Sequence, residues 1–370
     1  MATRTGWVVG LLVSLTFGCS ESSNAPARLV VTADWLNRSL SVFDYEKLTD
    51  GQSTASAALL RTIDLADWSP GPLEVELTPD GRTAVVAVGP GFFDGDGVTN
   101  GLVGSPEVPP GGALLIVDLE TEQVSQVPTQ YVPMGIAISP DGSTAYVANY
   151  GTTDAPDRTM MIVDLERRAV MQQLELEGRP EQVALSPDGA LGVINVAGSG
   201  GGIHVFETAD VAGTLSPLVP TGNDPSDVTF LEDGTRVVVA NSLSFDVTLV
   251  DTSNPSSPKV LGNFAISAGI PYGVTYMTSR NQILAPTGTG AHLVTIDIDG
   301  DMLIPSEPMP LPGGAFPLTA AVDATDRFAF VPHISDNMLS IVDIDTGASR
   351  AVRWLESPGP AYVAVQRGDD

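Results

Sequence analysis

One short pattern recurs seven times along this chain of 370 residues and limits its fold more than any other feature. Each copy begins at a proline and continues as alternating apolar residues, which in four copies end at a turn such as Ser139-Pro140-Asp141-Gly142. The copies are spaced by 61, 47, 45, 46, 46 and 43 residues and start at Pro72, Pro133, Pro180, Pro225, Pro271, Pro317 and Pro360. A period of about 45 residues with several strands per copy is typical of a β-propeller. The sequence therefore predicts an all-β fold, a seven-bladed β-propeller of four-stranded blades.

Each copy continues with the same order of elements. In the turn, proline fixes φ, Asp suits the second position and Gly adopts the left-handed conformation. A second strand follows, then a loop, a third strand that ends on an acid, and a weaker fourth strand. The acids are Asp44, Asp118, Asp164, Glu207, Asp251, Asp297 and Asp343. Because they recur in every blade, we expect each to accept backbone N–H groups of the next turn rather than to be catalytic.

The first and last repeats predict how the ring closes. The copy at Pro360 has a first strand only, whereas residues 28–44 read as a second and a third strand without a first. The N-terminal strands are therefore expected to complete the last blade, so that no sheet edge stays open at the seam. This assigns residues 28–370 to the propeller.

The residues before the propeller predict export and anchoring. Residues 1–18 read as a signal peptide, because Arg4 precedes an apolar run that is too short to span a bilayer. The segment LTFGC that ends at Cys19 resembles the lipobox of bacterial lipoproteins. This resemblance implies a lipid on Cys19, a tether over residues 19–27, and a place in the bacterial cell envelope, facing the periplasm or the exterior. The alternative is a buried cysteine behind an ordinary cleavage site.

The charge of the chain limits its partners. Asp and Glu number 45 against 17 Lys and Arg, which gives a formal net charge of −28. A phosphate-binding surface needs clustered cations, so we expect no nucleic-acid partner and no membrane contact apart from the lipid. A protein or a small neutral or cationic ligand remains as partner, and we expect a monomer.

The repeats resemble those of a known family. The segments AYVANYG, SPDG and MIVDLE are similar to YVTN-type repeats of bacterial seven-bladed propellers, a superfamily that also contains 6-phosphogluconolactonase-like proteins. Residues 249–264 resemble an LVIVD-type repeat. The resemblance extends from Arg28 to Gln366 and implies the propeller fold. It does not imply one activity, because such propellers include enzymes, cofactor-bearing subunits and surface-layer proteins.

Strand order assigns two faces to the predicted ring. The Pro-Asp-Gly turns lie on one face, which we call the turn face, and the loops after the second strands lie on the other, which we call the loop face. The last residues of the second strands form a candidate ligand-binding ring, which includes Asp34, Asn149, Asn241, Thr287 and His333. The alternative is a structural role, since Asn commonly ends strands and bonds loop backbone.

The loop face is also predicted to be acidic. Either the acids serve solubility, or they attract cations or a basic partner. The acids expected in the loops of this face are Asp34, Asp67, Asp94, Asp96, Asp154, Asp157, Asp224, Asp227, Asp246 and Asp336.

One loop of the first blade, residues 91–111, is longer than its sister loops and suggests calcium as the one candidate cofactor. Its DGDGVTN segment resembles the middle of a calcium loop, with Asp94, Asp96, the carbonyl of Val98 and Asn100 as oxygen ligands. Phe92 and Val103 stand where the pattern has acids. The alternative is an ordinary glycine-rich loop without metal.

Sequence motifs leave three functions open. The chain has no C-x-x-C-H, G-x-S-x-G or H-E-x-x-H motif. Its histidines are His204, His292 and His333, and the first two are not placed like a catalytic base, because His204 lies inside a third strand and His292 begins one. We therefore favour an exported, lipid-anchored binding module that acts through its acidic loop face. The alternatives are a lactonase-like hydrolase that uses polar residues at the channel mouth, and a calcium-stabilised envelope or surface component.

Overall fold

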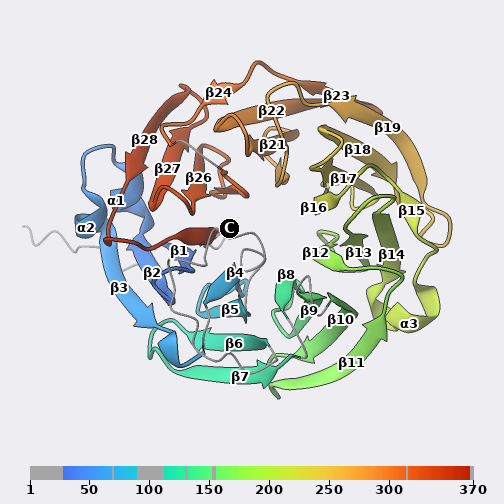
Figure 1. Cartoon of the computed structure of the whole chain (residues 1–370), viewed down its shortest axis with the longest axis horizontal. Helices are drawn as coiled ribbons and strands as arrows, with labels where there is room; N and C mark the ends of the chain where they lie inside the picture. The colour runs from blue at the N-terminus through green and yellow to red at the C-terminus, as the bar shows by residue number, and fades with distance from the viewer. Residues whose placement is uncertain are drawn as a thin grey trace, which may run out of the picture.

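Seven antiparallel sheets surround a central axis in the computed structural model, which describes residues 28–68, 71–89, 112–129, 132–151, 156–313 and 316–366 (Figure 1). The sheets stand like the blades of a propeller, with their innermost strands around a channel. This confirms the predicted all-β, seven-bladed fold. Within the described ranges, no helix has both the length and the apolar character needed to cross a membrane.

The strands of each blade follow one another from the central channel to the outside wall. Blade one is β4 (Pro72–Leu77), β5 (Thr83–Val88), β6 (Ala113–Asp118) and β7 (Val124–Pro128). Blade two is β8 (Pro133–Ile138), β9 (Thr144–Gly151), β10 (Pro156–Asp164) and β11 (Ala169–Glu175). Blade three is β12 (Pro180–Leu185), β13 (Leu191–Val196), β14 (Gly202–Glu207) and β15 (Val219–Pro220). Blade four is β16 (Pro225–Phe230), β17 (Arg236–Asn241), β18 (Asp246–Asp251) and β19 (Lys259–Ala265).

The remaining blades follow the same order. Blade five is β20 (Thr275–Met277), β21 (Gln282–Thr287), β22 (His292–Asp299) and β23 (Met302–Pro305), with β24 (Met309–Pro310) also paired to β22. Blade six is β25 (Ala321–Val322), β26 (Phe328–His333), β27 (Met338–Asp343) and β28 (Ala348–Val352). Blade seven is β29 (Pro360–Val365), β1 (Leu29–Asp34), β2 (Ser39–Asp44) and β3 (Leu59–Asp64). The short helices α1 (Tyr45–Thr49), α2 (Ala55–Ala58) and α3 (Val211–Thr214) and the 3-10 turns 66–68 and 208–210 connect strands.

Blade seven closes the ring as predicted. β29 pairs antiparallel with β1, with Thr32 opposite Val363 and Val31 opposite Ala364. The backbone N–H of Gln366 donates to the carbonyl of Leu29 at 2.8 Å. The two ends of the described chain therefore lie side by side at the turn face, and the C-terminal strand supplies the innermost position of the blade that the N-terminal strands complete (Figure 1).

The predicted turn chemistry is present in the described blades. Gly81, Gly142, Gly189 and Gly234 have φ between +66° and +73°, the left-handed conformation that a glycine adopts without strain. In the second blade, Asp141 Oδ1 accepts hydrogen bonds from Ser139 Oγ at 2.5 Å and from the N–H of Ser143 at 3.0 Å. The Ser139 hydroxyl, followed by the Ser143 groups, lowers the pKa of Asp141 to about 2. The aspartate is therefore a structural part of the turn.

The acids that end the third strands are also structural. Five of them accept a backbone N–H from the following turn, as the sequence predicts: Asp44, Asp118, Asp164, Asp251 and Asp343. Asp297 instead accepts the side-chain amide of Gln282 at 2.6 Å. Glu207 accepts no such bond from the turn that follows it. The prediction is therefore confirmed in five blades and differs in blades three and five.

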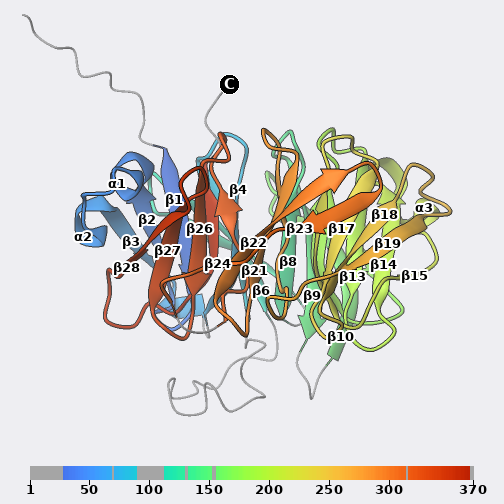
Figure 2. The ribbon, with the colours of Figure 1, turned by 90° about the horizontal axis from the view of Figure 1, so that it is seen from above.

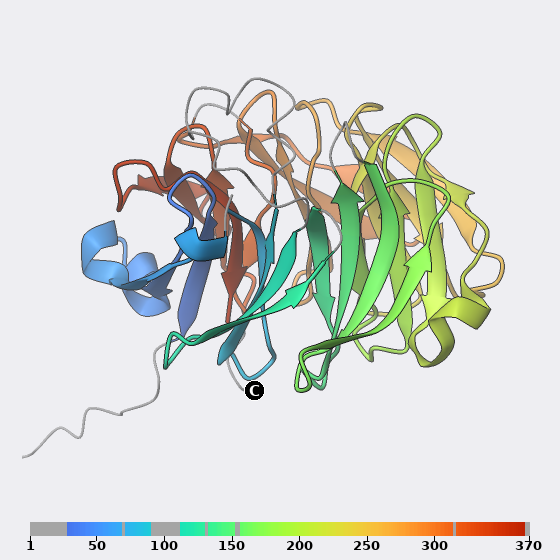
Figure 3. The ribbon, with the colours of Figure 1, turned by 60° about the horizontal axis from the view of Figure 1, so that its bottom comes forward.

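The hydrophobic core lies between neighbouring blades rather than at the centre of the ring. One cluster joins Val31 and Val42 of blade seven to Val75 and Val86 of blade one, and all four are fully buried. Full burial of each such side chain contributes about 1.5–3 kcal/mol to stability. Figure 2 shows the ring from its edge, and Figure 3 shows outer strands such as β7 and β11 on the outside wall. Apolar packing therefore fills the space between the blades, and the innermost strands border the central channel.

Candidate functional site: the central channel

The innermost strands line the channel in layers, because every second side chain of a strand points to the same side. The third residue of each repeat contributes to one layer, which we call the waist: Glu74, Gly135, Gln182, Asp227, Gly273, Thr319 and Tyr362. The fifth residue forms the next layer toward the turn face: Glu76, Ala137, Ala184, Thr229, Thr275, Ala321 and Ala364. The waist carries large polar side chains, whereas the next layer is mostly small. The channel therefore widens toward the turn face.

Two cavities meet at the waist. The larger one, which we call the basin, has a volume of about 700 Å³ and extends from the waist to turn residues such as Pro79, Pro140 and Pro187. The smaller one, which we call the vestibule, has a volume of about 80 Å³ on the loop-face side. Its walls are Leu73, Met134, Glu181, Ser226, Tyr272, Leu318 and Ala361. Gln182, Asp227, Thr319 and Tyr362 line both cavities, so these four side chains separate them.

Glu74 links three blades across the waist. Its Oε1 accepts the backbone N–H of Ile136 at 2.9 Å, and its Oε2 accepts the side-chain amide of Gln182 at 2.6 Å. The intervening residue is Gly135, where an added Cβ would lie 2.6 Å from the Cα of Gln182. A side chain in blade two would therefore block the contact between blades one and three. Burial, followed by the neighbouring Glu76, raises the pKa of Glu74 well above its usual range.

Asp227 repeats this arrangement on the opposite part of the ring. It accepts the N–H of Val228 and, from the next blade, the N–H of Val274, both at 2.8 Å. That blade again has a glycine in the waist, Gly273. Burial raises the pKa of Asp227 to about 7, because the two N–H donors compensate only part of the lost hydration. A carboxyl group that titrates near neutral pH therefore faces both cavities.

The channel lining is acidic. Glu181 in the vestibule has a raised pKa because of burial and then of the nearby Asp224 and Asp227. Burial also raises the pKa of Tyr362, to which the charges of Glu74, Glu76 and Asp227 add. Among the described residues that line the two cavities, none is Lys, Arg or His. Where these carboxyls are ionised, the lining attracts cations and repels anions, and in either protonation state it accepts hydrogen bonds from neutral ligands.

The five residues of the predicted ligand-binding ring lie behind this lining. Asp34, Asn149, Asn241, Thr287 and His333 are each 0% exposed, and none lines either cavity. Four of the five bond a hydroxyl on the neighbouring third strand of their own blade, as His333 Nε2 does with Ser340 Oγ at 2.8 Å. These contacts are those of the structural alternative, and a role in ligand binding stays a prediction.

Besides Asp34, which ends β1, three acids of the predicted acidic loop face lie in strands. Asp227 belongs to β16 and lines the channel, Asp157 in β10 is 5% exposed, and Asp246 begins β18 and accepts the side-chain amide of Asn241 at 2.7 Å. The prediction that these three lie in loops is therefore wrong. Burial and strand pairing at the ends of the blades, rather than exposure to solvent, determine their surroundings.

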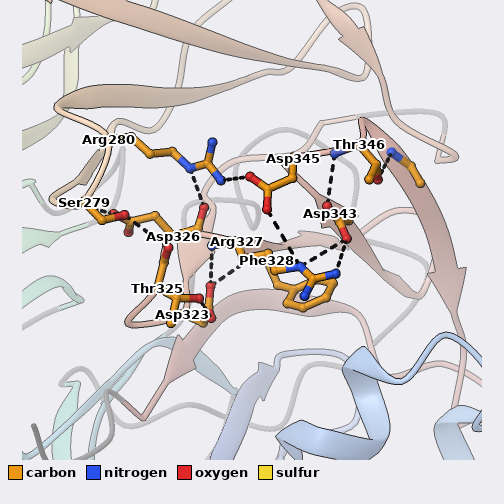
Figure 4. A network of polar contacts seen from close by, with 11 residues as sticks. Ser279, Arg280, Asp323, Thr325, Asp326, Arg327, Phe328, Asp343, Asp345 and Thr346 are labelled. Atoms are coloured by element: carbon orange, nitrogen blue, oxygen red, sulfur yellow. Dashed lines mark hydrogen bonds and ion pairs between the residues drawn. The ribbon is translucent and has the colours of Figure 1, made fainter.

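Carboxylates are also numerous on the turn face. In a network between blades five and six, Asp326 Oδ2 accepts the N–H and the hydroxyl of Ser279 at 2.6 and 2.8 Å (Figure 4). Arg280 donates to the carbonyl of Asp326 at 2.8 Å and forms an ion pair with Asp345. The acidity of the described chain is therefore not confined to the loop face.

Two further predictions fall outside the described residues. These are lipidation of Cys19 and calcium binding by Asp94, Asp96, Val98 and Asn100. Within the ranges that the structure describes, no three acidic, histidine or cysteine side chains are placed to share a metal ion. Both predictions stay untested.

The waist is not among the sites predicted from the sequence. Its signal is a polar residue in the third position of the innermost strand, as in the segments PLE, PEQ, PSD and PAY, which begin at Pro72, Pro180, Pro225 and Pro360. A strand packed on both faces would have apolar residues there. The polar positions therefore indicate which side of the innermost strands faces the channel.

Comparisons with known proteins support the fold but identify no activity. No family model matches the sequence, and no curated protein matches it. Solved structures do match. A protein of unknown function from Desulfotomaculum acetoxidans is 17% identical, with 93% of this chain and 100% of that chain covered and a TM-score of 0.71. The periplasmic gluconolactonase of Pseudomonas aeruginosa is 17% identical, with 91% and 98% covered and a TM-score of 0.69.

Hydrazine synthase of Kuenenia stuttgartiensis is a third example. It is 19% identical, with 75% of this chain and 77% of that chain covered and a TM-score of 0.58. All three share the propeller fold with this chain. Because identities below 20% join proteins as different as a gluconolactonase and a hydrazine synthase, the likeness shows the fold alone.

Proposed function

We propose that this protein is a binding protein of the bacterial cell envelope that takes a small neutral or cationic ligand in its central channel. The observation that supports this most is the basin of about 700 Å³ with a polar floor of Gln182, Asp227, Thr319 and Tyr362. Ligand sites typically have volumes of about 300–1,000 Å³ and a few convergent polar groups in a mostly apolar wall. The basin has the volume and the convergent polar groups, because the small fifth-layer residues leave space on the turn-face side of the waist.

Filling the basin tests this function. Ala184→Trp places a large ring among the small residues of the fifth layer and should abolish the binding of ligands that occupy the basin, with little loss of stability, because the ring enters open space. The measurement is the rise in melting temperature with a panel of sugars, amino sugars, lactones and amines. Ala348→Trp, on the exposed outer strand β28, is the matched control and should keep the response.

A second candidate, lactone hydrolysis, is tested in the same experiment. The observations that favour it are the fold shared with a gluconolactonase and the pKa of about 7 of Asp227, which suits a general base at neutral pH. In this mechanism, Asp227 takes a proton from the water that attacks the lactone carbonyl. Ring opening of gluconolactone that is lost in Asp227→Asn would favour the hydrolase. If no compound raises the melting temperature and no lactone opens, the channel function is wrong.

Export and lipid anchoring belong to the same proposal and rest on the sequence. Residues 19–27 could span at most about 30 Å when fully extended. Arg28, where the described chain begins, lies at the turn face, because its carbonyl accepts the N–H of Tyr45 at 2.9 Å just before β1 starts. A lipid on Cys19 would therefore hold the turn face toward the bilayer and present the loop face to the surroundings.

Cys19→Ala tests the anchor. The variant should move from the membrane fraction to the soluble fraction, because one removed thiol removes the lipid and the chain has no other cysteine. Fractionation followed by immunoblotting measures this, with Ser20→Ala as the control that stays with the membrane. Retention of Cys19→Ala in the membrane fraction, or a mature N-terminus beyond residue 19, would contradict lipidation.

A further inference from the structure

We propose that the vestibule is a cage for an organic ammonium group, a primary or quaternary amine of small size. This inference rests on the proposed channel function and names the chemical class of its ligand. Two features of the vestibule support it, namely carboxyl groups from several blades and two tyrosines that line the same small cavity.

The carboxylates come from separate blades. Glu74 of blade one, Glu181 of blade three and Asp227 of blade four all line the vestibule. Both oxygens of Glu74 and of Asp227 already accept hydrogen bonds from the protein, which fixes where these two groups point. No hydrogen bond to the carboxylate of Glu181 is present in the described structure. Glu181 is therefore the group best able to approach a cation directly.

The cation nearest to Glu181 is held elsewhere. The guanidinium of Arg179 stacks over the ring of Tyr150, 3.7 Å from its centroid, and Arg179 Nε donates to the carbonyl of Tyr150 at 3.1 Å. The neighbouring acid Asp224 is also engaged, since it accepts the N–H of Gly198 and the hydroxyl of Ser242. The vestibule therefore has buried carboxyl groups in its wall, whose ionised form a bound cation would favour, and the guanidinium of Arg179 stacks on another ring.

The two rings are Tyr272 and Tyr362. The backbone of Tyr272 is held by Ser226, whose hydroxyl donates to the Tyr272 carbonyl at 2.8 Å. Its ring packs beside Gly288, where an added Cβ would lie 3.0 Å from Cε2. The faces of aromatic rings attract cations, and the attraction grows where water is excluded. A cavity of about 80 Å³ suits one ammonium head with its methyl groups rather than a whole sugar.

Isothermal titration calorimetry with choline tests the cage. The uncharged isostere 3,3-dimethylbutan-1-ol has the same shape and is the matched probe. We expect choline to bind about tenfold more tightly than the isostere, because only the cation interacts with the carboxylates and the ring faces. Glu181→Gln and Tyr272→Leu should each weaken choline binding about tenfold, whereas Tyr272→Phe keeps the ring and should retain it.

The outcomes separate this inference from the channel function. Choline binding that survives Ala184→Trp but not Tyr272→Leu places the cation in the vestibule, as proposed. Equal binding of choline and its isostere, or loss of choline binding only in Ala184→Trp, would overturn the cage. Absence of choline binding in a protein that still binds sugars or lactones would overturn it too and leave the channel function intact. If Tyr272→Leu fails to fold, Glu181→Gln decides.

Discussion

Ending the chain after Gly359 is expected to lower the free energy of unfolding by about 5 kcal/mol or more and to open the ring. The deletion removes β29, in which Val363 and Ala364 are 1% and 6% exposed. Val363 packs with Phe43 and Phe330 between blades six and seven, and Ala364 packs with residues of blades seven and one. Loss of one strand therefore removes packing on both sides of the seam and exposes the edge of β1.

Urea unfolding and melting temperature measure this effect. The matched control ends the chain after Gln366 and keeps all of β29, so its stability should equal that of the full chain. The two truncations differ by only seven residues, 360–366, which limits the comparison to the closing strand. An unchanged melting temperature for the shorter chain would contradict closure of the ring by β29.

The fold could be predicted because its signals are local and repeated. A turn such as 139–142 depends on four consecutive residues, and its hydrogen bonds join groups at most five positions apart. Seven copies of one strand order then require a closed ring, and the missing strands at the two ends identify the seam. Every step needs only residues that are neighbours in the sequence or in the same blade.

The channel could not be predicted in this way. The bond between Glu74 and Gln182 joins residues 108 positions apart, and it exists because Gly135 leaves a gap in the blade between them. The sequence places all three at the same position of the repeat but does not say that this position faces the lumen. The predicted ligand-binding ring does not line the channel, although its residues were placed correctly in the strands. Asp34 and His333 do end second strands, yet third-strand hydroxyls and packing enclose them.

Asp34 gives rise to the second large expected effect, on the pH dependence of stability. It is 0% exposed and accepts hydrogen bonds from Thr32 Oγ1 at 2.8 Å and Ser41 Oγ at 2.5 Å, with Trp354 Nε1 at 3.4 Å. Burial nevertheless raises the pKa of Asp34 from 3.8 to about 7, because the lost hydration of the carboxylate outweighs these donors. The buried carboxyl of Asp34 therefore loses its proton only as the pH approaches neutrality.

The direction of the effect follows from the two pKa values. Between pH 3.8 and about 7 the folded chain holds a proton on Asp34 that the unfolded chain has lost, so the free energy of unfolding falls as the pH rises through this window. For Asp34 alone, the fall from about pH 5 to about pH 7.5 amounts to about 2.5 kcal/mol. Asp227 acts in the same direction, with a smaller effect because it faces a cavity.

His333 opposes these carboxyls. Burial lowers the pKa of His333 to about 4. Below pH 6.5 its imidazole therefore binds a proton in the unfolded chain but not in the folded chain. This contribution to stability is present above pH 6.5 and is lost as the pH falls toward 4. The pH profile of the unaltered protein is therefore a sum of opposite slopes, and a variant has to isolate the part that belongs to Asp34.

Asp34→Asn isolates it. Asn occupies the corresponding position in Asn149 and Asn241, so the amide suits this place in a blade, and it carries no titratable proton. Urea unfolding at about pH 5 and about pH 7.5 measures the change for the unaltered chain and the variant, and the two changes should differ by about 2.5 kcal/mol, with the variant gaining relative stability at the higher pH. Asp80→Asn, in an exposed turn, is the control, because its pKa lies below the usual value and no titration occurs in this window. Equal changes in the unaltered chain and in Asp34→Asn would mean that the hydrogen bonds from Thr32 and Ser41 keep Asp34 charged at the lower pH, and burial would then not control this site.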